Sequence, residues 1–363
     1  MNIYINGRFL TQPVTGVQRY AREVVKRWDA LLEAEEPDGS RDRFALLVPP
    51  GATCDLKLRR IEIRQVGSRL AGHAWEQLTL PWHARDGWLI NLCNTGPLAK
   101  RRQIATIHDT AVFEYPQSFS FLFRQAYRII QQGLGVMARR IVTVSDFSKS
   151  QLIAHCRIPE NKIRVVALGN EHMREQQPDY GVYDKQGIVP GRYLLAVSSL
   201  NPSKNFANIV RAIEMLPDAD YEIVIAGASN AKVFGRAELP HADKIKLAGY
   251  VTDAELKALY EGAACFVFPS LYEGFGLPPL EAMSCGTPVV ASDAASLPEV
   301  CGEAVLYCDP HSPGDIARQI GAVMNDVRVR DRLSGRGLRQ AARFSWVACA
   351  RQTLEVVKEA VHP

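Results

Sequence analysis

The sequence lacks any apolar run long enough to cross a bilayer. Its longest apolar runs, such as 263–269 and 288–291, fall far short of the roughly 18 to 20 residues that a membrane-spanning helix needs. The first residues, MNIYINGRFL, also lack the charged region and the long apolar stretch of a signal peptide. We therefore expect no transmembrane helix and a cytoplasmic location.

The sequence also lacks cysteines at the spacing of a metal or redox site. Its eight cysteines form no CxxC motif and have no histidine cluster beside them, so neither zinc binding nor a redox function is indicated. Low-complexity tracts and repeats with a period of about 20 to 50 residues are absent as well, which excludes solenoids and propellers. We expect reduced cysteines and no metal site.

Length and composition favour a folded protein with two domains. The 363 residues are 47% hydrophobic and 23% charged, the balance of a soluble globular protein, and one domain usually holds about 100 to 200 residues. Residues 1–170 contain 24 Lys and Arg against 15 Asp and Glu, a net +9, whereas residues 171–363 contain 19 against 24, a net −5. The first part is expected to face an anionic partner, unless its charges are simply solvated.

Strand and helix patterns alternate in both halves of the chain. This alternation predicts a largely parallel, doubly wound sheet in each half, because right-handed crossovers place helices on both faces. A capping box from Thr252 to Glu255 predicts a helix that begins near residue 253. The predicted strands are 3–6, 44–48, 61–66, 88–92, 104–107, 141–144, 163–168, 193–198, 221–226, 245–247, 265–269, 288–291 and 304–307.

A polar segment rich in Gly and Pro, residues 169–192, separates the two halves. We expect a first α/β domain at 1–170, a linker at 171–191 and a second α/β domain at 192–343. Residues 328–360 have a helical pattern, and we expect the helix at 344–363 to return to the first domain.

The passage FPSLYEGFGLPPLEAMSCGTPVVASD, residues 268–293, joins a predicted strand to a helix through a glycine-rich turn. Gly274 and Gly276 let the backbone approach a ligand, and the helix start with its free amides favours a diphosphate. Glu281, one turn inside the helix, is placed to accept two ribose hydroxyls, with Glu273 nearer a sugar. Ordinary turn and helix-cap chemistry is the alternative explanation.

This passage resembles the Glu, seven residues, Glu signature of retaining glycosyltransferases, especially family 4. The runs AVSSLNPSKNF, VIAG, LAGYV and SLPEV follow that family's order and spacing. The resemblance implies the GT-B fold, in which two Rossmann-like domains face a cleft and the last helix crosses back to the first domain. It also implies substrate binding by Ser199, Asn205, Tyr250, Val251, Gly274, Phe275, Gly276, Leu277 and Glu281.

Lys204 follows the first strand of the second half, where an ammonium can neutralise the phosphates of a departing nucleotide. The resemblance implies that Lys204 and Glu273 are catalytic. Family members often have an arginine just before this lysine, whereas this chain has Ser203, so leaving-group stabilisation is expected to be weaker or to come from elsewhere. A solvated lysine at a helix start is the alternative.

Two runs of the first half carry further candidates. TGVQRY, residues 15–20, resembles the family's amino-terminal glycine loop and implies substrate binding by Gly16 and Val17. TIHDTAVFEYPQSFS, residues 106–120, places His108 and Asp109 at the carboxyl end of a strand. The resemblance implies that both are catalytic, with His108 touching the donor sugar; capping of the next turn is the alternative role for Asp109.

The resemblance implies a hexosyltransferase of bacterial O-antigen, capsule or exopolysaccharide synthesis that retains the anomeric configuration and needs no metal or cofactor. GDP-mannose is the expected donor, and other mannose or rhamnose-type donors are alternatives. The basic amphipathic segment 119–140 and AKRR at 99–102 predict attraction to an anionic membrane and an undecaprenyl-diphosphate-linked acceptor. Packing of that segment on its own sheet is the alternative.

Two other functions stay open at this point. A nucleotide-sugar epimerase of the same fold would bind the same donor without transferring its sugar. A nucleic-acid-binding protein would use the +9 half, but the basic residues are scattered and no known binding module is present, so we expect no nucleic acid partner.

Overall fold

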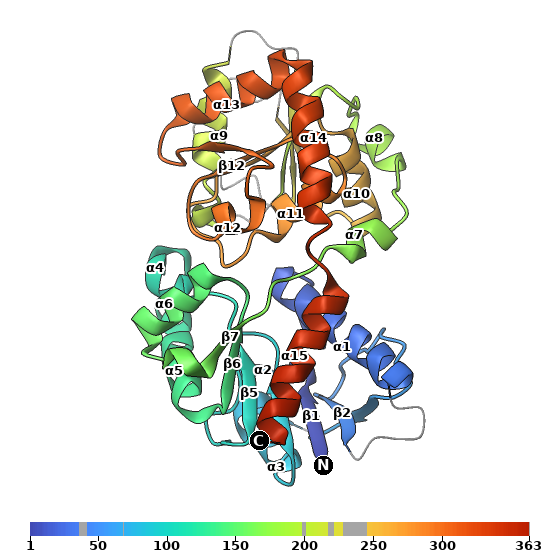
Figure 1. Ribbon diagram of the computed structural model, residues 1–363, viewed down its shortest axis with the longest axis vertical. Coiled ribbons are helices and arrows are strands. Elements are labelled where there is room, and N and C mark those ends of the chain that lie inside the picture. Colours follow the sequence, from blue (N-terminus) through green and yellow to red (C-terminus); the bar gives the residue numbers. More distant parts are fainter. Residues whose placement is uncertain (36–41, 68, 198–200, 217–220, 228–244, 363) are drawn as a thin grey trace. The chain divides into compact units, whose positions relative to one another are not determined.

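The computed structural model describes residues 1–35, 42–67, 69–197, 201–216, 221–227 and 245–362. The chain divides into two compact units (Figure 1). The first contains Met1–Gly169 and Ser345–Pro363, and the second contains Asn170–Phe344. The chain thus enters the second unit once and returns once to the first.

Within the described residues, the first unit has a parallel sheet of seven strands. They are β1 (Asn2–Asn6), β2 (Arg43–Val48), β3 (Glu62–Gln65), β4 (Trp88–Asn91), β5 (Gln103–Thr106), β6 (Arg140–Thr143) and β7 (Ile163–Val165). Their order is β3-β2-β1-β4-β5-β6-β7, and every pairing is parallel. The direction of strand addition reverses between β1 and β4, and such a switch point is where open α/β sheets bind ligands.

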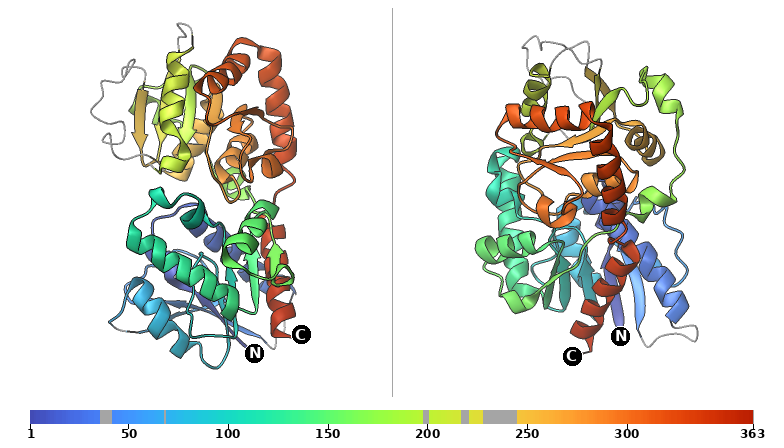
Figure 2. Two further views of the ribbon diagram at one scale, coloured as in Figure 1. Left: turned by 90° about the vertical axis from the view of Figure 1, so that its left-hand side faces the viewer. Right: turned by 45° about the horizontal axis from the view of Figure 1, so that its top comes forward.

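Helices cover both faces of this sheet (Figure 2). α1 (Gly16–Glu35) leads from β1 towards β2, and α5 (Phe121–Met137) leads from β5 to β6. Because these connections run in opposite directions along the sheet, right-handed crossovers place the two helices on opposite faces. The unit also contains η1 (Gly7–Thr11), α2 (Gly72–Ala74), the π-helical turn η2 (Trp75–Thr79), α3 (Leu80–His83), α4 (Ala111–Glu114), η3 (Pro116–Ser118), α6 (Asp146–Cys156) and η4 (Glu160–Lys162).

The last helix, α15 (Trp346–Val361), packs beside α1 in the first unit (Figure 1). Trp28 on α1 is fully buried, and its indole Nε1 donates a hydrogen bond of 2.7 Å to the carbonyl of Ala350. Tyr20 lies about two helical turns earlier on α1, and its ring centroid is 6.3 Å from that of Trp346. The predicted return of the final helix to the first domain is therefore confirmed.

The second unit repeats the design with a parallel sheet of six described strands. They are β8 (Tyr193–Val197), β9 (Glu222–Ala226), β10 (Ile245–Gly249), β11 (Cys265–Phe268), β12 (Val289–Ser292) and β13 (Leu306–Cys308), in the order β10-β9-β8-β11-β12-β13. Its switch point lies between β8 and β11. The helical elements are α7 (Glu171–Glu175), α8 (Gly181–Gln186), η5 (Pro202–Lys204), α9 (Phe206–Glu214), α10 (Asp253–Gly262), α11 (Leu277–Ser284), α12 (Leu297–Cys301), α13 (Pro313–Asn325) and α14 (Val327–Ala341).

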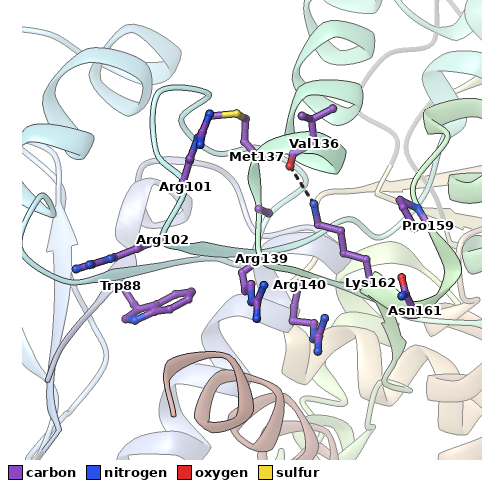
Figure 3. Close-up of a pocket in the computed structure, with 11 residues that line it drawn as sticks. Trp88, Arg101, Arg102, Val136, Met137, Arg139, Arg140, Pro159, Asn161 and Lys162 are labelled. Atoms are coloured by element: carbon purple, nitrogen blue, oxygen red, sulfur yellow. Dashed lines mark hydrogen bonds between the residues drawn. The ribbon is translucent and has the colours of Figure 1, made fainter. Parts of the chain in front are cut away.

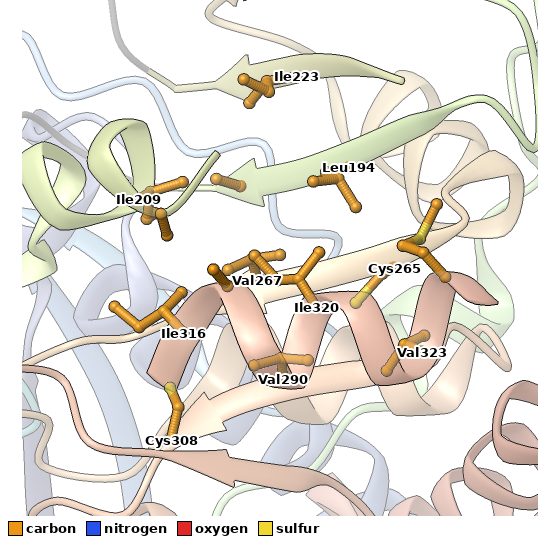
Figure 4. Close-up of a cluster of buried hydrophobic side chains, with 14 of the residues drawn as sticks. Leu194, Ile209, Ile223, Cys265, Val267, Val290, Cys308, Ile316, Ile320 and Val323 are labelled. Atoms are coloured by element: carbon orange, nitrogen blue, oxygen red, sulfur yellow. The ribbon is translucent and has the colours of Figure 1, made fainter. Parts of the chain in front are cut away.

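The core of the second unit lies between its sheet and α13 (Figure 4). Ile316, Ile320 and Val323 occupy one stripe of α13 and are each fully buried. They meet Val267 of β11 and Val290 of β12, which are also inaccessible to solvent. At about 1.5 to 3 kcal/mol for each large aliphatic side chain, this packing holds β11 and β12 firmly, and both strands carry loops that matter below.

The segment 171–191, interpreted from the sequence as a linker, contains α7 and α8 and lies within the second unit. The Tyr183 hydroxyl donates to the carbonyl of Ala258 at 2.5 Å, and Lys185 pairs with Glu255 at 2.8 Å, so both fix the segment to α10. Helices of five and six residues are too short to show a 3.6-residue repeat, which explains why the sequence pattern does not reveal them.

The capping box at Thr252 is present, with its hydroxyl and the Glu255 carboxylate bonding reciprocally to backbone amides at 3.2 and 2.8 Å. The predicted start of a helix near residue 253 is confirmed by α10. The helical pattern at 328–360 proves to be two helices, α14 and α15. Ser345 separates them, because its hydroxyl caps α15 by accepting from the amides of Val347 and Ala348.

Candidate active site

The glycine-rich loop of the second unit leads from β11 into α11 and contains Gly276 at its end. Gly276 has φ of +105°, and a Cβ there would lie 2.6 Å from the Cδ2 of Leu297. A left-handed backbone of this kind is accessible to glycine at little cost. The loop therefore needs glycine at the residue that starts α11.

The start of α11 offers fewer N–H donors to an anion than the sequence suggests. Pro278 and Pro279 occupy the second and third helical positions and have no N–H to offer. The amides of Phe275, Gly276 and Leu277 donate to no protein acceptor within the described residues. These three N–H groups, together with the positive end of the α11 dipole, are available to an anion.

Lys204 lies beside Glu273, which belongs to this loop. The two residues are close because they follow β8 and β11, which are neighbouring strands of the sheet. The Lys204 Nζ donates to Glu273 Oε1 at 2.5 Å, and the hydroxyl of Ser270 donates to the same oxygen at 2.6 Å. The two charged side chains are 21% and 12% exposed, so both are reachable from solvent. Lys204 also lies 5.4 Å from the ring centroid of Phe268, which favours a cation.

The side chain of Asn205, which the sequence predicts to bind substrate, makes its hydrogen bonds within the protein. Its side-chain amide donates to the carbonyls of Pro269 and Pro310 at 3.0 and 2.6 Å, and the residue is buried. With φ of +64° it forms the left-handed turn between η5 and α9. Asn205 therefore positions Lys204, and its two amide hydrogens are already used.

The remaining predicted residues of this unit are dispersed. Tyr250, just after β10, is 73% exposed, and Val251 follows it at the same edge of the sheet. Phe275 is buried with its ring edge-on to that of Phe344 at 5.7 Å, and Leu277 is buried too. Ser199 lies outside the described residues.

Glu281 is held from two sides by residues that the sequence did not single out. Its Oε1 lies 2.8 Å from the Nε2 of His172 on α7, and its Oε2 accepts from the Tyr260 hydroxyl at 3.1 Å. The Glu281 side chain is only 8% exposed. A carboxylate has about four lone-pair sites, so each oxygen keeps one site for a hydroxyl donor.

In the first unit, His108 follows β5 and its ring is buried. The ring Nε2 lies 3.0 Å from the carbonyl of Leu92, and since a carbonyl only accepts, Nε2 carries the hydrogen. Burial lowers the pKa of His108 to about 4, against a smaller opposite effect of the Leu92 contact. The imidazole is therefore neutral at pH 7, and the His108 carbonyl accepts from the Ser148 hydroxyl at 2.9 Å.

The other first-unit candidates stand at the carboxyl edge of the same sheet. The Asp109 carboxylate accepts from the amide of Ala111 at 2.9 Å, which is turn capping. Gly16 is exposed at the first residue of α1, and the carbonyl of Val17 accepts from the Cys93 thiol at 3.6 Å. The start of α1 thus lies beside the residues that follow β4.

Comparison with known proteins identifies this combination of loops. A model of the family described as glycosyl transferases group 1 matches residues 184–340. The O-antigen chain mannosyltransferase B of Escherichia coli is 31% identical over 380 residues, covering 95% of this chain and 96% of that protein. The chain belongs to the group 1 glycosyltransferases. The predicted resemblance to family 4 and its O-antigen mannosyltransferase branch is confirmed.

Two solved structures show the same fold as this group 1 glycosyltransferase. Sucrose-phosphate synthase from Thermosynechococcus elongatus has a TM-score of 0.76 and 17% identity, with 99% of this chain and 98% of that chain covered. The HepE protein of Anabaena, in complex with UDP and glucose, also has a TM-score of 0.76 and 17% identity, covering 99% and 100%. The GT-B prediction is confirmed. These comparisons give no support to the epimerase or nucleic-acid alternatives.

The part of the glycosyltransferase that the structure describes contains no helix both long and apolar enough to span a membrane. Its described residues also contain no group of three or more His, Cys, Asp or Glu side chains placed to hold a metal ion. The described cysteines are free thiols, and burial raises the pKa of Cys265 and Cys301 to about 12.

A basic hollow of about 550 Å³ lies at the amino ends of β4 and β6, at the edge of the sheet opposite to His108 (Figure 3). Its lining includes Arg101, Arg102, Arg139, Arg140 and Lys162, with no acidic residue. Lys162 donates to the carbonyls that end α5, and burial with its two neighbouring arginines lowers the pKa of Lys162. This hollow is separate from the candidate active site.

Proposed function

We propose that this glycosyltransferase transfers mannose from GDP-mannose to a glycan acceptor in the synthesis of a cell-surface polysaccharide. The E. coli relative that aligns along nearly the whole chain is a mannosyltransferase of the O-antigen chain. The Anabaena structure with UDP and glucose makes a UDP-sugar the second candidate donor. Both donors share a nucleotide diphosphate and a hexose.

The observation that carries this proposal is the loop pair at the β8–β11 switch point. The carboxyl edge of this sheet carries three amides without a protein acceptor, at the start of α11, and the ammonium of Lys204. Both kinds of group stabilise a diphosphate. Glu281 lies one turn further along α11 with a lone-pair site left on each oxygen, and we assign it to the two ribose hydroxyls.

We infer that transfer retains the anomeric configuration and proceeds on one face of the sugar. The acceptor oxygen bonds to the anomeric carbon while the bond from that carbon to the diphosphate oxygen breaks, and its electron pair leaves with the nucleotide. The acceptor proton passes to the departing phosphate oxygen. Lys204 and the α11 amides stabilise the charge that develops there, so we propose that no metal ion is required.

A donor panel tests the proposal. GDP-mannose, UDP-glucose and dTDP-rhamnose are each incubated with the full chain and an α-linked mannotriose as acceptor, and release of each nucleotide is measured with and without EDTA. We expect GDP release from GDP-mannose to be the fastest and unaffected by EDTA. NMR of the product should show an α-linked sugar from the α-linked donor. A β-linked product would reject retention, and release of none of these nucleotides would reject the donor class.

The matched variants Glu281→Gln and Glu303→Gln locate the donor site. Glu281 is buried and bonded on both oxygens, whereas Glu303 is exposed on the same unit. Loss of a charged acceptor for two hydroxyls should reduce kcat/KM about hundredfold in the first variant and leave the second unchanged. Equal values in the two variants would remove Glu281 from the donor site.

We also propose that the first unit works at the cytoplasmic face of an anionic membrane, on a lipid-diphosphate-linked acceptor. Leu122, Ile129 and Val136 are spaced seven residues apart on α5 and are 79%, 61% and 78% exposed. This stripe ends at the basic hollow, because Val136 also lines that hollow. An apolar stripe beside four arginines is typical of a helix that lies on an anionic leaflet.

Flotation with vesicles of anionic or neutral lipid, at low and high salt, tests this membrane proposal. The double variant Arg139→Gln, Arg140→Gln is compared with Arg328→Gln, Arg332→Gln, which removes the same charge from the exposed face of α14. We expect salt-sensitive binding to anionic vesicles that only the first pair of substitutions weakens, since each charge contributes about 1 kcal/mol. Binding without anionic preference would reject the proposal.

A further inference from the structure

A polar cluster fills the switch point of the first sheet, between the carboxyl ends of β1 and β4. Asn6 ends β1 and Asn91 ends β4, and the two side chains share a hydrogen bond of 3.0 Å. The equivalent place in the second sheet holds Lys204 and the glycine loop. Because open α/β sheets bind ligands outside this crevice, the contents of the cluster indicate what the first unit binds.

Glu76 is the centre of this cluster. Its side chain is 1% exposed, and its Oε1 accepts from Asn6 Nδ2, Arg8 Nε and the Thr95 hydroxyl at 2.8, 3.0 and 3.0 Å. It lies on η2, a π-helical turn, and such turns are often found at functional sites. A buried ion pair contributes little net stability because desolvation offsets the attraction, so stability alone does not account for it.

His73 connects this buried ion pair to the surface. Its Nδ1 lies 3.2 Å from Glu76 Oε2, and its side chain is 41% exposed. Burial alone would raise the pKa of Glu76, but the hydrogen bond from His73 and the charge of Arg8 outweigh it and lower the pKa. An ionised carboxylate only accepts, so Nδ1 carries the hydrogen of this contact, and Nε2 is the ring nitrogen left for a ligand hydroxyl.

A row of aromatic rings leads along α5 to His73. Phe119 stacks on Phe123 at 5.5 Å between ring centroids, Phe123 stacks on Tyr127 at 4.0 Å, and the Tyr127 ring meets His73 edge-on at 5.6 Å. Phe123 is 38% exposed, so the row lies at the surface. Tyr127 also lies beside the guanidinium of Arg8.

We propose that the aromatic row of Phe119, Phe123 and Tyr127, together with His73 and the Glu76–Arg8 pair behind it, is the acceptor-saccharide subsite. A pyranose ring has an apolar face of C–H groups that packs on an aromatic ring, and hydroxyls around its rim that need donors and acceptors. The row supplies flat apolar surface, and the cluster supplies hydrogen-bonding groups at one end. The inference rests on the proposed function, because it assigns this surface to the saccharide that accepts the transferred hexose.

An α-linked mannotriose serves as the probe, with binding to the full chain followed by saturation-transfer NMR in the presence of GDP. The variants are Phe123→Ala, Tyr127→Ala and His73→Ala, all at partly exposed positions. The matched control is Ile153→Ala on α6 of the same unit, because Ile153 is 37% exposed, close to the 38% of Phe123, and belongs to neither proposed surface. We expect each of the three variants to weaken mannotriose binding roughly three- to tenfold, and the control to leave it unchanged.

Steady-state kinetics separate positioning from folding. The three variants should raise the KM for mannotriose and leave the KM for GDP-mannose unchanged, while Tyr127→Phe, which keeps the ring, should retain most of the affinity. Equal mannotriose binding in all variants overturns the inference. So does loss of vesicle binding in Phe123→Ala with unchanged mannotriose binding, which would assign the row to lipid.

The failure of this inference is distinguishable from failure of the proposed function. If the unaltered chain releases GDP from GDP-mannose but does not bind mannotriose, the acceptor subsite alone is overturned. If it neither binds GDP nor consumes any nucleotide sugar, the proposed donor chemistry fails and the acceptor subsite fails with it.

Discussion

Replacement of Lys204 by glutamine is the most direct perturbation of the proposed donor chemistry. The side chain keeps a similar length and an N–H donor but loses its charge. In the structure the Lys204 Nζ bonds to Glu273 Oε1 at 2.5 Å, and the Ser270 hydroxyl bonds to the same oxygen. Glu273 therefore keeps one donor in the variant, so the local fold should survive.

The size of the effect follows from the position of the ammonium. Two unit charges about 4 Å apart interact by about 4 kcal/mol at the effective dielectric constant of about 20 that suits a site near the surface. Lys204 is 21% exposed, and it also attracts the phosphates of the bound donor, so only part of this energy is specific to the transition state. We expect kcat/KM to fall about hundredfold, equivalent to about 2.7 kcal/mol.

The assay is release of GDP from GDP-mannose, with thermal unfolding measured in parallel. Lys257→Gln is the matched control, because Lys257 is 14% exposed, belongs to the same unit and lies 3.8 Å from Glu261. Tm should change little in either variant, since partly exposed ion pairs contribute about 0 to 1 kcal/mol. An unchanged kcat/KM in Lys204→Gln, or an equal loss in Lys257→Gln, would refute the reasoning.

Three further predictions concern the supporting structure. The pKa of His108 is about 4 in the folded protein and about 6.5 in the unfolded chain, so the free energy of unfolding is unaffected by this group above pH 6.5 and falls by about 3 kcal/mol as the pH drops to 4. Urea unfolding of His108→Gln should lack this loss. The same pH dependence in the variant would contradict the prediction. Gly276→Ala forces φ of +105° on alanine and should lower the free energy of unfolding by about 1 to 2 kcal/mol. Gly335→Ala inside α14 should raise it by about 0.5 to 1 kcal/mol. Similar urea midpoints for the two variants would be evidence against the strained turn. Tyr260→Phe removes one of two bonds to Glu281 and should weaken GDP binding about tenfold by calorimetry; unchanged affinity would show that Tyr260 does not position the carboxylate.

The strands were predictable because their sequences are short apolar runs bounded by turn residues. Each predicted strand is present, and the differences lie at the ends. Residues 163–168 were expected to be extended, but β7 stops at Val165, whose partner Thr143 is the last residue of β6. A strand ends where its neighbour ends, and that information is not in its own sequence.

The candidate site was predictable only where it is local in the chain. Lys204 and the loop from Glu273 to Leu277 follow strands directly, so the order of elements is enough to place them at one edge. His172 and Tyr260 were missed because their contact with Glu281 depends on how α7 and α10 pack against α11. A histidine 109 positions away from its carboxylate partner leaves no spacing to detect.

The two sheets share one topology, and their switch points have different chemistry. The β8–β11 switch point holds a cation and amides that have no protein acceptor, which suits the anionic half of a nucleotide sugar. At the β1–β4 switch point the charges of Arg8 and Glu76 cancel, and the groups that reach the surface are an imidazole and aromatic rings. A neutral, hydroxyl-rich ligand gains from such a surface and a diphosphate does not. This contrast supports the proposal that the donor binds to the second unit and the acceptor sugar to the first, even though the first unit carries the larger positive charge. Part of that charge lies elsewhere, because the four arginines of the basic hollow are at the opposite edge of the first sheet.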